Sequence, residues 1–258
     1  MILDQVKKNF IENKIQNGER EDGRGLLDYR AIRVQKGFVP NAEGSCLAQI
    51  GDTKVLCGVK FDVMAPFADR PDEGVFMTNS EFAPMAHPDF HPGPPNEDSI
   101  ELARVVDRGI RSAELLDVKN MFLEEGKVLG LFIDLYVLDH AGNLMDTAAL
   151  SAMGALQDTQ VPKYENGKII RGEFLGPLKL ADTIVTTTFE RIGSQYVVDA
   201  TAAEEVASAG RLTLGTAEGH FICASQKSGR AGITREKYDQ MIDWAFQKHA
   251  ELVRTLEG

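Results

Sequence analysis

The stretch EGSCLAQIGDTKVLCGVKF, residues 43–61, decides the fold class of the first half of this chain. It contains two apolar runs, at 45–50 and 53–61, on either side of the pair Gly51-Asp52. A glycine and an aspartate between two such runs are typical of a tight turn between paired strands. A third run at 29–36, where Ile32 and Val34 alternate with arginines, precedes them. The pattern predicts an antiparallel meander.

Strands and helices alternate in the rest of the chain. Five prolines between Pro84 and Pro95 exclude a helix or central strand there, so we expect an ordered loop followed by a long helix. A helix of small residues is predicted from Asp146, its expected N-cap, to about Gln157, and a last helix at 234–256 has Thr234 as N-cap. Further strands are expected at 128–138, 183–192, 195–200, 211–216 and 219–225. This order predicts an α/β (α+β) fold of two similar βα halves, with mixed sheets packed against helices.

The chain is long enough for one domain, 1–258, and we expect that a division into two packed halves would fall near 170–180. We expect an amphipathic helix at 2–16 that packs on a partner or on the chain's own core. The residues at near-helical spacing are Ile2, Val6 and Phe10, together with Leu3 and Ile15.

The composition is that of a soluble globular protein. The hydrophobic fraction is 43%, the charged fraction is 26%, and no apolar run is long enough for a membrane span. Charges interrupt every turn of the N-terminal segment, which is unlike a secretory signal, so a cytoplasmic location is expected. Cys46, Cys57 and Cys223 show no CxxC spacing and are expected to be reduced. The net charge of −11 excludes nucleic-acid binding by the whole surface and leaves only a local basic patch.

One such patch is predicted on a helix at 99–117, SIELARVVDRGIRSAELLD. At 100° per residue its apolar residues form one face, while Arg104, Arg108 and Arg111 form a stripe on another. Guanidinium groups one helical turn apart suit successive phosphates of a single strand. The alternative is a solvated face, with the arginines paired to acidic neighbours on the same helix, Glu101, Asp107 and Glu114.

Three further groups of residues have mainly structural interpretations. In REDGRGLLDYR, Arg20, Arg24, Asp28 and Arg30 are expected to form a fixed ion-pair network. His87 and His91 bracket an aspartate, but the prolines between them break helical geometry and no third ligand lies nearby, so a surface loop is expected and no metal site. A second basic cluster, whose role the sequence leaves open, consists of Lys227, Arg230 and Arg235.

Three stretches together resemble the RNase PH family, and within it the non-catalytic ring subunits of the archaeal exosome. They are residues 20–30 followed by 43–60, the helix at 99–117, and VVDATAAEE at 197–205. The resemblance implies a two-layered α/β fold and a hexameric ring, a trimer of heterodimers with a catalytic RNase PH-like paralogue. It further implies RNA-binding cap subunits, single-stranded RNA as the ligand, no cofactor and no membrane partner. In this family the arginines of the 99–117 helix line the path of RNA that is degraded from the 3′ end by phosphorolysis.

Two departures from the pattern of active family members predict that the chain has no catalytic residues of its own. Where active members read roughly G-T-R-[TS]-A, this chain has DHAGNLMDTAAL, residues 139–150, without the arginine that would hold phosphate. The two aspartates of active members correspond to Asp199 and Glu205, interpreted as a vestigial acidic pair whose ability to bind a cation stays open. The alternatives are an exoribonuclease active by itself and a scaffold without RNA contacts.

Overall fold

The computed structural model describes residues 2–257, with side chains described from Gln5 onward. Its first sheet runs in the order β1-β2-β3-β6-β4, with the short β5 (Phe122–Glu124) paired to β6. The predicted meander is confirmed as β1 (Ile32–Lys36), β2 (Gly44–Ile50) and β3 (Thr53–Met64), joined in part by the Gly51-Asp52 turn. β6 (Lys127–Asp139) is antiparallel to β3, and β4 (Val75–Phe82) is parallel to β6. The sheet is therefore mixed.

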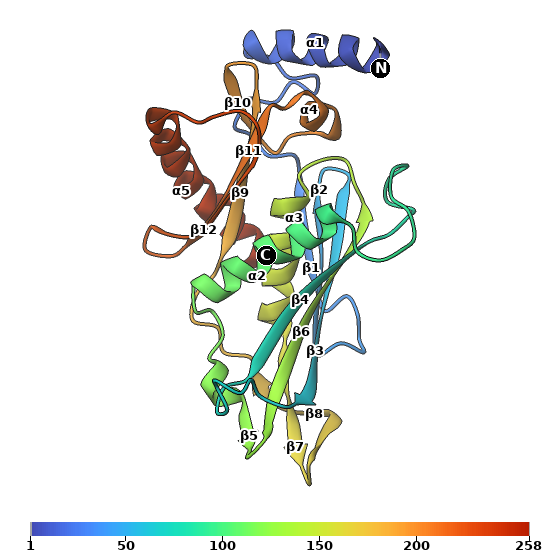
Figure 1. The fold of residues 1–258 in the computed structure, drawn as a ribbon, viewed down its shortest axis with the longest axis vertical. Helices are drawn as coiled ribbons and strands as arrows, with labels where there is room; N and C mark the ends of the chain where they lie inside the picture. The colour runs from blue at the N-terminus through green and yellow to red at the C-terminus, as the bar shows by residue number, and fades with distance from the viewer. Residues whose placement is uncertain (1, 258) are drawn as a thin grey trace.

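The second sheet is antiparallel throughout and runs in the order β10-β9-β11-β12. Its strands are β9 (Val185–Ile192), β10 (Gln195–Val198), β11 (Gly210–Ala217) and β12 (Phe221–Gly229), close to the predicted ranges. A separate hairpin, β7 (Gln160–Glu165) with β8 (Lys168–Pro177), was not expected from the sequence, and neither was β4. The α/β class with sheets packed against helices is confirmed, but only the first of the two larger sheets is mixed (Figure 1).

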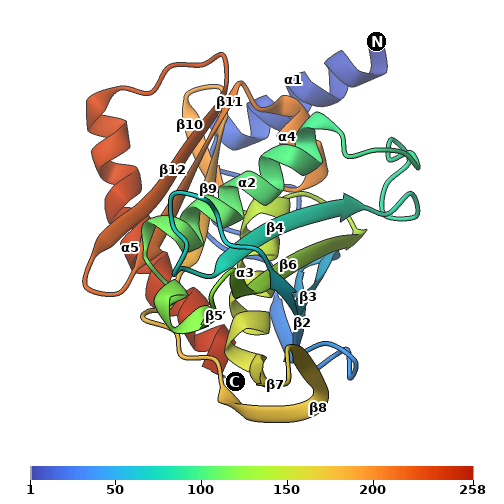
Figure 2. The same ribbon diagram turned by 60° about the horizontal axis from the view of Figure 1, so that its bottom comes forward.

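Helix α3 (Leu144–Asp158) lies between the two sheets, and α5 (Arg235–Glu257) covers the outer face of the second (Figure 2). Small residues let α3 pack closely: a Cβ on Gly154 would lie 2.5 Å from the Cys46 sulfur. The Ser151 hydroxyl donates to strand carbonyls of the first sheet, 2.8 Å from Cys46 O. Both Cys46 and Cys57 are buried and free, as expected, and burial raises the pKa of Cys46 to about 12.

The predicted N-cap of α3 was wrong. Asn143 is the N-cap residue, in a left-handed conformation with φ 57°. Asp146 lies inside the first turn, fully buried, where its carboxylate accepts hydrogen bonds from the hydroxyls of Thr186 and Thr188 on β9. It therefore fastens α3 to the second sheet instead of capping the helix.

Helix α2 (Glu97–Ser112) follows the proline-rich loop and packs against β4 and β12. The Asn96 side chain caps it by accepting from the Ser99 amide at 2.8 Å. Its predicted apolar face is buried, and that face includes Leu102, Val106 and Ile110. The opposite face is left for the arginines.

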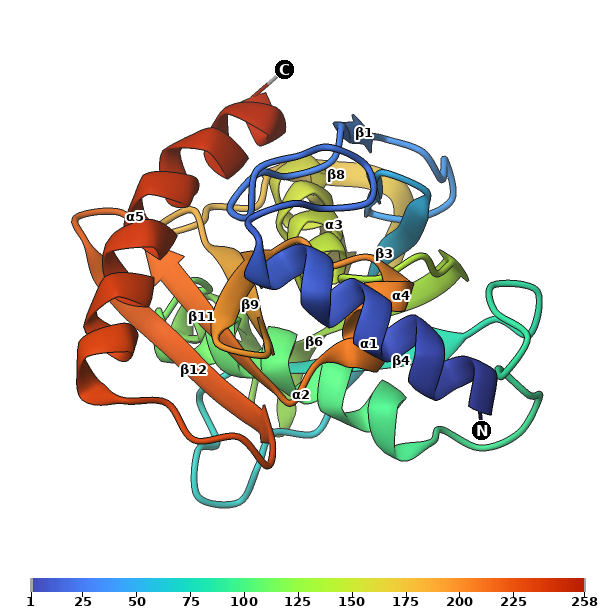
Figure 3. The ribbon, with the colours of Figure 1, turned by 90° about the horizontal axis from the view of Figure 1, so that it is seen from above.

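Helix α1 (Ile2–Gln16) crosses one end of the molecule beside α4 (Ala202–Ala207), as Figure 3 shows from above. Ile11 and Ile15 are its buried residues, whereas the predicted contact residues Val6 and Phe10 are 60% and 51% exposed. Within this chain the helix therefore packs through Ile11 and Ile15, and packing of Val6 and Phe10 on a partner stays a prediction. Ile2 and Leu3 lie outside the residues whose side chains are described. Among residues 2–257, no helix is both long and apolar enough to cross a membrane.

Candidate nucleic-acid interface

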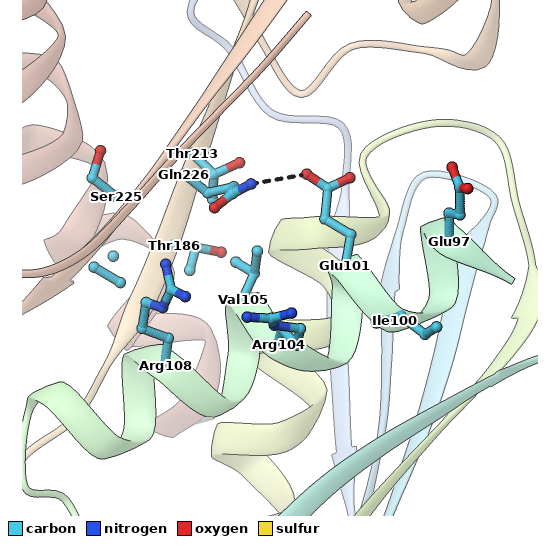
Figure 4. A pocket seen from close by; sticks show the side chains of 12 residues that line it. Glu97, Ile100, Glu101, Arg104, Val105, Arg108, Thr186, Thr213, Ser225 and Gln226 are labelled. Carbon is cyan, nitrogen blue, oxygen red and sulfur yellow. Dashed lines mark hydrogen bonds between the residues drawn. The ribbon is translucent and has the colours of Figure 1, made fainter. Parts of the chain in front are cut away.

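A groove of about 340 Å³ opens between α2 and the inner face of the second sheet (Figure 4). Arg104 and Arg108, one turn apart on α2, line it together. Both side chains are exposed, and neither guanidinium forms an ion pair or hydrogen bond with a side chain that the structure describes. Opposite them lie polar residues of β9, β11 and β12, among them Thr186, Ser225 and Gln226. The groove therefore offers two unneutralised cations to an anionic ligand.

Arg111 lies apart from the other two arginines, so the predicted stripe is divided. Its guanidinium bonds the Asp107 carboxylate at 3.0 Å and lies 3.9 Å from the centre of the Phe76 ring. It borders a different depression, near Arg70 and Glu73. For Arg111 the alternative of a salt-bridged helix face is the one observed.

Glu101 lies where the groove borders a second, smaller pocket. Its carboxylate accepts hydrogen bonds from Arg211 at 2.9 Å, Gln226 at 3.3 Å and Ser228 at 2.6 Å. Burial alone would raise the pKa of Glu101, but the bond from Ser228 and the charge of Arg211 hold it below its usual value. The predicted pairing of Glu101 with neighbouring helix arginines is therefore absent among the described side chains, because β11 and β12 supply its partners.

Beyond Glu101 lies a smaller pocket of about 190 Å³. Its polar lining includes Asp98, His140, Asn143 and Glu205, together with Glu101 and Arg211. Burial lowers the pKa of His140 to about 4, so this imidazole is neutral at physiological pH. The pocket is consequently dominated by carboxylates.

The two members of the predicted acidic pair have different surroundings. Asp199 is buried, and its carboxylate accepts from the Arg30 guanidinium, the Arg30 amide, Arg24 and the Asn143 side chain at 2.7–2.9 Å. Burial would raise its pKa, but the Arg30 hydrogen bonds and charge lower it. Asp199 is therefore a neutralised structural carboxylate.

The Glu205 carboxylate lies at the start of α3. It accepts the Asn143 N–H at 2.7 Å, and its second oxygen is 3.8 Å from His140 Nε2. Burial raises the pKa of Glu205. The position at a helix N-terminus where an external anion would bind is thus occupied by a side chain of the chain itself. Within residues 2–257, no group of three His, Cys, Asp or Glu side chains is arranged to hold a metal ion.

The expected network of Arg20, Arg24 and Arg30 exists, but its carboxylates come from the second half of the chain. Arg20 is buried and bonds Glu204 at 2.6 Å, while Arg24 and Arg30 bond Asp199. Asp28 was assigned wrongly to this network, because its carboxylate instead accepts the Gly25 amide. Local spacing does not reveal such distant partners.

The remaining sequence candidates lie at the surface. His87 packs near Phe90 and His140, with ring centroids 5.4 and 5.3 Å away, and His91 is exposed. Of the second basic cluster, Lys227 bonds the Gly229 carbonyl and Arg235 pairs with Asp239 one turn later. Sequence reasoning missed Arg211 and Asn143. The sequence did contain one indication of Arg211, because an arginine stands at the first position of the predicted apolar strand 211–216.

A mixed sheet and an antiparallel sheet that enclose one shared helix define a two-part α/β protein. Two family models match in chain order, 3′ exoribonuclease family domain 1 at residues 28–162 and domain 2 at residues 182–248. The chain belongs to this 3′ exoribonuclease (RNase PH) family.

Several relatives are similar over nearly the whole length. The exosome complex component Rrp42 of Thermococcus gammatolerans is 42% identical, with 99% of this chain and 95% of the relative covered. Rrp42 of Methanothermobacter thermautotrophicus is 39% identical over 99% of this chain and 96% of its own. A chain of the Archaeoglobus fulgidus exosome with RNA bound to the active site superposes with a TM-score of 0.91 at 38% identity, covering 98% and 99% of the two chains.

Proposed function

We propose that this protein is a non-catalytic subunit of an exosome, a complex that degrades RNA from the 3′ end by phosphorolysis. In this proposal it pairs with a catalytic RNase PH-like paralogue in a hexameric ring in the cytoplasm, carries RNA-binding cap subunits, and contributes Arg104 and Arg108 to the binding of single-stranded RNA. The similarity to archaeal Rrp42 proteins along the chain supports the assignment to an exosome.

The observation that carries the non-catalytic role is the contact between Glu205 and the Asn143 amide. Phosphorolysis requires inorganic phosphate beside the scissile bond, and helix N-terminal amides with an arginine are the usual means of binding it. Here a carboxylate occupies the amide at the start of α3, and the nearby arginines Arg24 and Arg30 are neutralised by Asp199. An incoming phosphate would meet negative charge and no free cation.

The RNA-binding role is supported by the contrast between the arginines of α2. Arg104 and Arg108 line an open groove together, whereas Arg111 is engaged by Asp107 and Phe76. Each guanidinium group can bind two oxygens of one phosphate, and two such groups one helical turn apart can bind successive phosphates of a flexible strand. We therefore assign the phosphate contacts to Arg104 and Arg108, with Arg111 as a weaker contributor.

A phosphorolysis assay tests the non-catalytic role. The purified chain alone, given single-stranded RNA and inorganic phosphate, is expected to release no nucleoside diphosphates, because it cannot hold the attacking phosphate. The same chain assembled with the catalytic paralogue is expected to release them steadily, and a complex carrying Glu205→Gln should do so at a nearly unchanged rate.

Two outcomes would contradict the proposal. Steady diphosphate release by the chain without the paralogue would make it an enzyme in its own right. A loss of about a hundredfold in the assembled Glu205→Gln complex, or about 2.7 kcal/mol of transition-state stabilisation, would give Glu205 a part in the chemistry.

A further inference from the structure

The groove that contains Arg104 and the smaller pocket that contains Asn143 are two parts of one crevice between α2 and the second sheet. Glu101 lines both parts, Arg104 and Arg108 line only the first, and Arg211 lines only the second. The Glu101–Arg211 ion pair, 2.9 Å long, therefore stands at the boundary. Figure 4 shows Glu101 extending across the crevice toward Gln226 on β12.

The two parts have opposite electrostatic character. The first carries the guanidinium groups of Arg104 and Arg108, which have no carboxylate partners among the described side chains, and one carboxylate that they outnumber, Glu97. The second carries Asp98 and Glu205, a neutral His140, and an Arg211 whose charge is already offset by Glu101. Phosphates are attracted to the first part and repelled by the second.

The two parts also differ in size. The first has a volume of about 340 Å³, and the second about 190 Å³. Pockets that hold organic ligands typically start at roughly 300 Å³. The first part reaches this size, and the second, which is also open to solvent, does not.

We propose that Glu101, fixed by Arg211, Gln226 and Ser228, is an acidic end wall that confines bound RNA to the Arg104–Arg108 groove and keeps its 3′ end away from the start of α3. This role rests on the proposed RNA-binding function. Arg211, Gln226 and Ser228 donate hydrogen bonds to the Glu101 carboxylate and hold it across the crevice. The carboxylate takes these partners on the second sheet, although Arg104 is closer to it in the sequence. Glu101 acts as a positioning residue, since it repels a strand that other residues bind.

The wall determines which subunit receives the 3′ end of the RNA. An RNA strand that entered the vestigial site would be held where no phosphorolysis takes place. By stopping the strand at Glu101, the subunit leaves the 3′ end free for the catalytic paralogue.

Photo-crosslinking of the assembled complex tests the wall. An RNA that carries 4-thiouridine at every uridine of its 3′ segment is bound without inorganic phosphate, so that it is not degraded, then irradiated and mapped by trypsin digestion. Residues 212–227 form a single tryptic peptide on the groove side, and residues 128–163 form one that contains His140 and Asn143. In the wild-type complex, crosslinks within this subunit are expected in 212–227 and not in 128–163. Crosslinking of the wild-type complex into 128–163 would overturn the proposal.

Glu101→Gln supplies the second arm. The amide keeps the shape of the side chain but removes the repelling charge and leaves the charge of Arg211 unbalanced. RNA affinity is expected to rise by about fivefold, the scale of one partly exposed charge interaction, and crosslinks are expected to extend into 128–163. Glu114→Gln, the same charge change at an exposed site bordering a different depression, is the matched control and should do neither.

Failure of the wall and failure of the RNA-binding function are distinguishable. If replacing Arg104 and Arg108 by Ala leaves RNA affinity unchanged, the RNA-binding function itself is wrong. If that change weakens binding while Glu101→Gln alters neither affinity nor crosslinks in an assembled complex, Glu101 only clamps α2 to the second sheet.

Discussion

Asp199 lies where the N-terminal segment meets the second half of the chain. It takes a left-handed conformation with φ 51°, and its buried carboxylate is shared between Arg24 and Arg30. Removing one partner from a buried ion pair costs more than the pair contributes, because the remaining charges stay desolvated. We interpret Asp199 as a structural residue whose ion pairs join the N-terminal segment to the second half of the chain.

Replacing Asp199 by Asn is therefore expected to destabilise the protein by about 3 kcal/mol, since two arginines lose their counter-ion. Chemical denaturation at pH 7 measures the change in the free energy of unfolding. Glu205→Gln is the control and should cost about 1 kcal/mol, the scale of one hydrogen bond at a partly exposed carboxylate. Equal losses for both variants would contradict a special structural role for Asp199.

The same residue makes a pH-dependent contribution to stability. Because the pKa of Asp199 is lower in the folded than in the unfolded chain, its contribution is complete above the unfolded value, about 4, and disappears as the pH falls through the folded value. Asp199→Asn should accordingly flatten the acid side of the stability profile. An unchanged acid slope would argue against this assignment.

At this scale the sequence indicated which residues matter better than it indicated their partners. The charges at Arg20, Arg24 and Arg30 predicted an ion-pair network, but Asp199 and Glu204 lie far away in the sequence. Asp146 was predicted as a cap from its place before a run of small residues, yet it is held by hydroxyls of a strand about forty residues further on. Spacing rules describe local neighbours, and these contacts are formed by the folding of the whole chain.

Helix α2 divides its arginines between two environments, so their replacement should give different results. Arg104→Ala with Arg108→Ala is expected to weaken RNA binding by the complex and to flatten the plot of log K against log salt by about 0.7 for each lost phosphate contact. Arg111→Ala, the matched control on the same helix, should change RNA affinity less, since its charge is already paired with Asp107. The measurement is RNA affinity between about 50 and 200 mM salt, with intact assembly verified.

The scaffold alternative predicts a different result. Unchanged affinity and slope in the double variant would reduce α2 to a solvated face. A larger loss for Arg111→Ala than for the pair would move the RNA path to the depression near Arg70.

Strands with clean alternation and long amphipathic helices were predictable, and less regular elements were not. β2 and β3 alternate around a turn and were located almost to the residue. β4 is an edge strand with a mixed burial pattern, and β8 is largely exposed and contains Gly172 with φ 84°. Both owe their conformation to pairing with β6 and β7, which no local pattern reports. In α1, packing on α4 and the second sheet buries Ile15, which spacing predicted, together with Ile11, which it did not.

The whole molecule presents apolar groups that a partner would cover. Phe221 on the edge strand β12 is 68% exposed, and Leu175 on β8 is 70% exposed. Exposed apolar side chains on sheet edges are typical of surfaces that pair with other chains. In the proposed ring, we expect these side chains to contact neighbouring subunits.

Native mass measurement tests that assembly. When the catalytic paralogue is present, we expect a particle that contains three copies of the paralogue and three copies of this 28.3 kDa chain. When the paralogue is absent, we expect no such particle. Because the proposed ring alternates the two subunits, neither alone should close it. A monomer that persists in the presence of excess paralogue would contradict the proposed ring.

Molecular organisation could be predicted from the sequence only in outline. The order of elements predicted two βα halves, and a division near 170–180 stays a prediction. What the pattern did not show is that α3, which follows the first sheet in the chain, is covered by the second sheet as well. A helix that is apolar and small on nearly every side is consistent with burial but does not identify both neighbours.

The position of α3 has a consequence for synthesis of the protein. The helix leaves the ribosome about sixty residues before the end of β11 at Ala217, and until then one of its faces has no cover. During that interval Asp146 lacks the threonine hydroxyls of β9 that later satisfy its carboxylate. We expect the first half to stay incompletely packed until translation has passed the second sheet, because α3 is buried by both sheets.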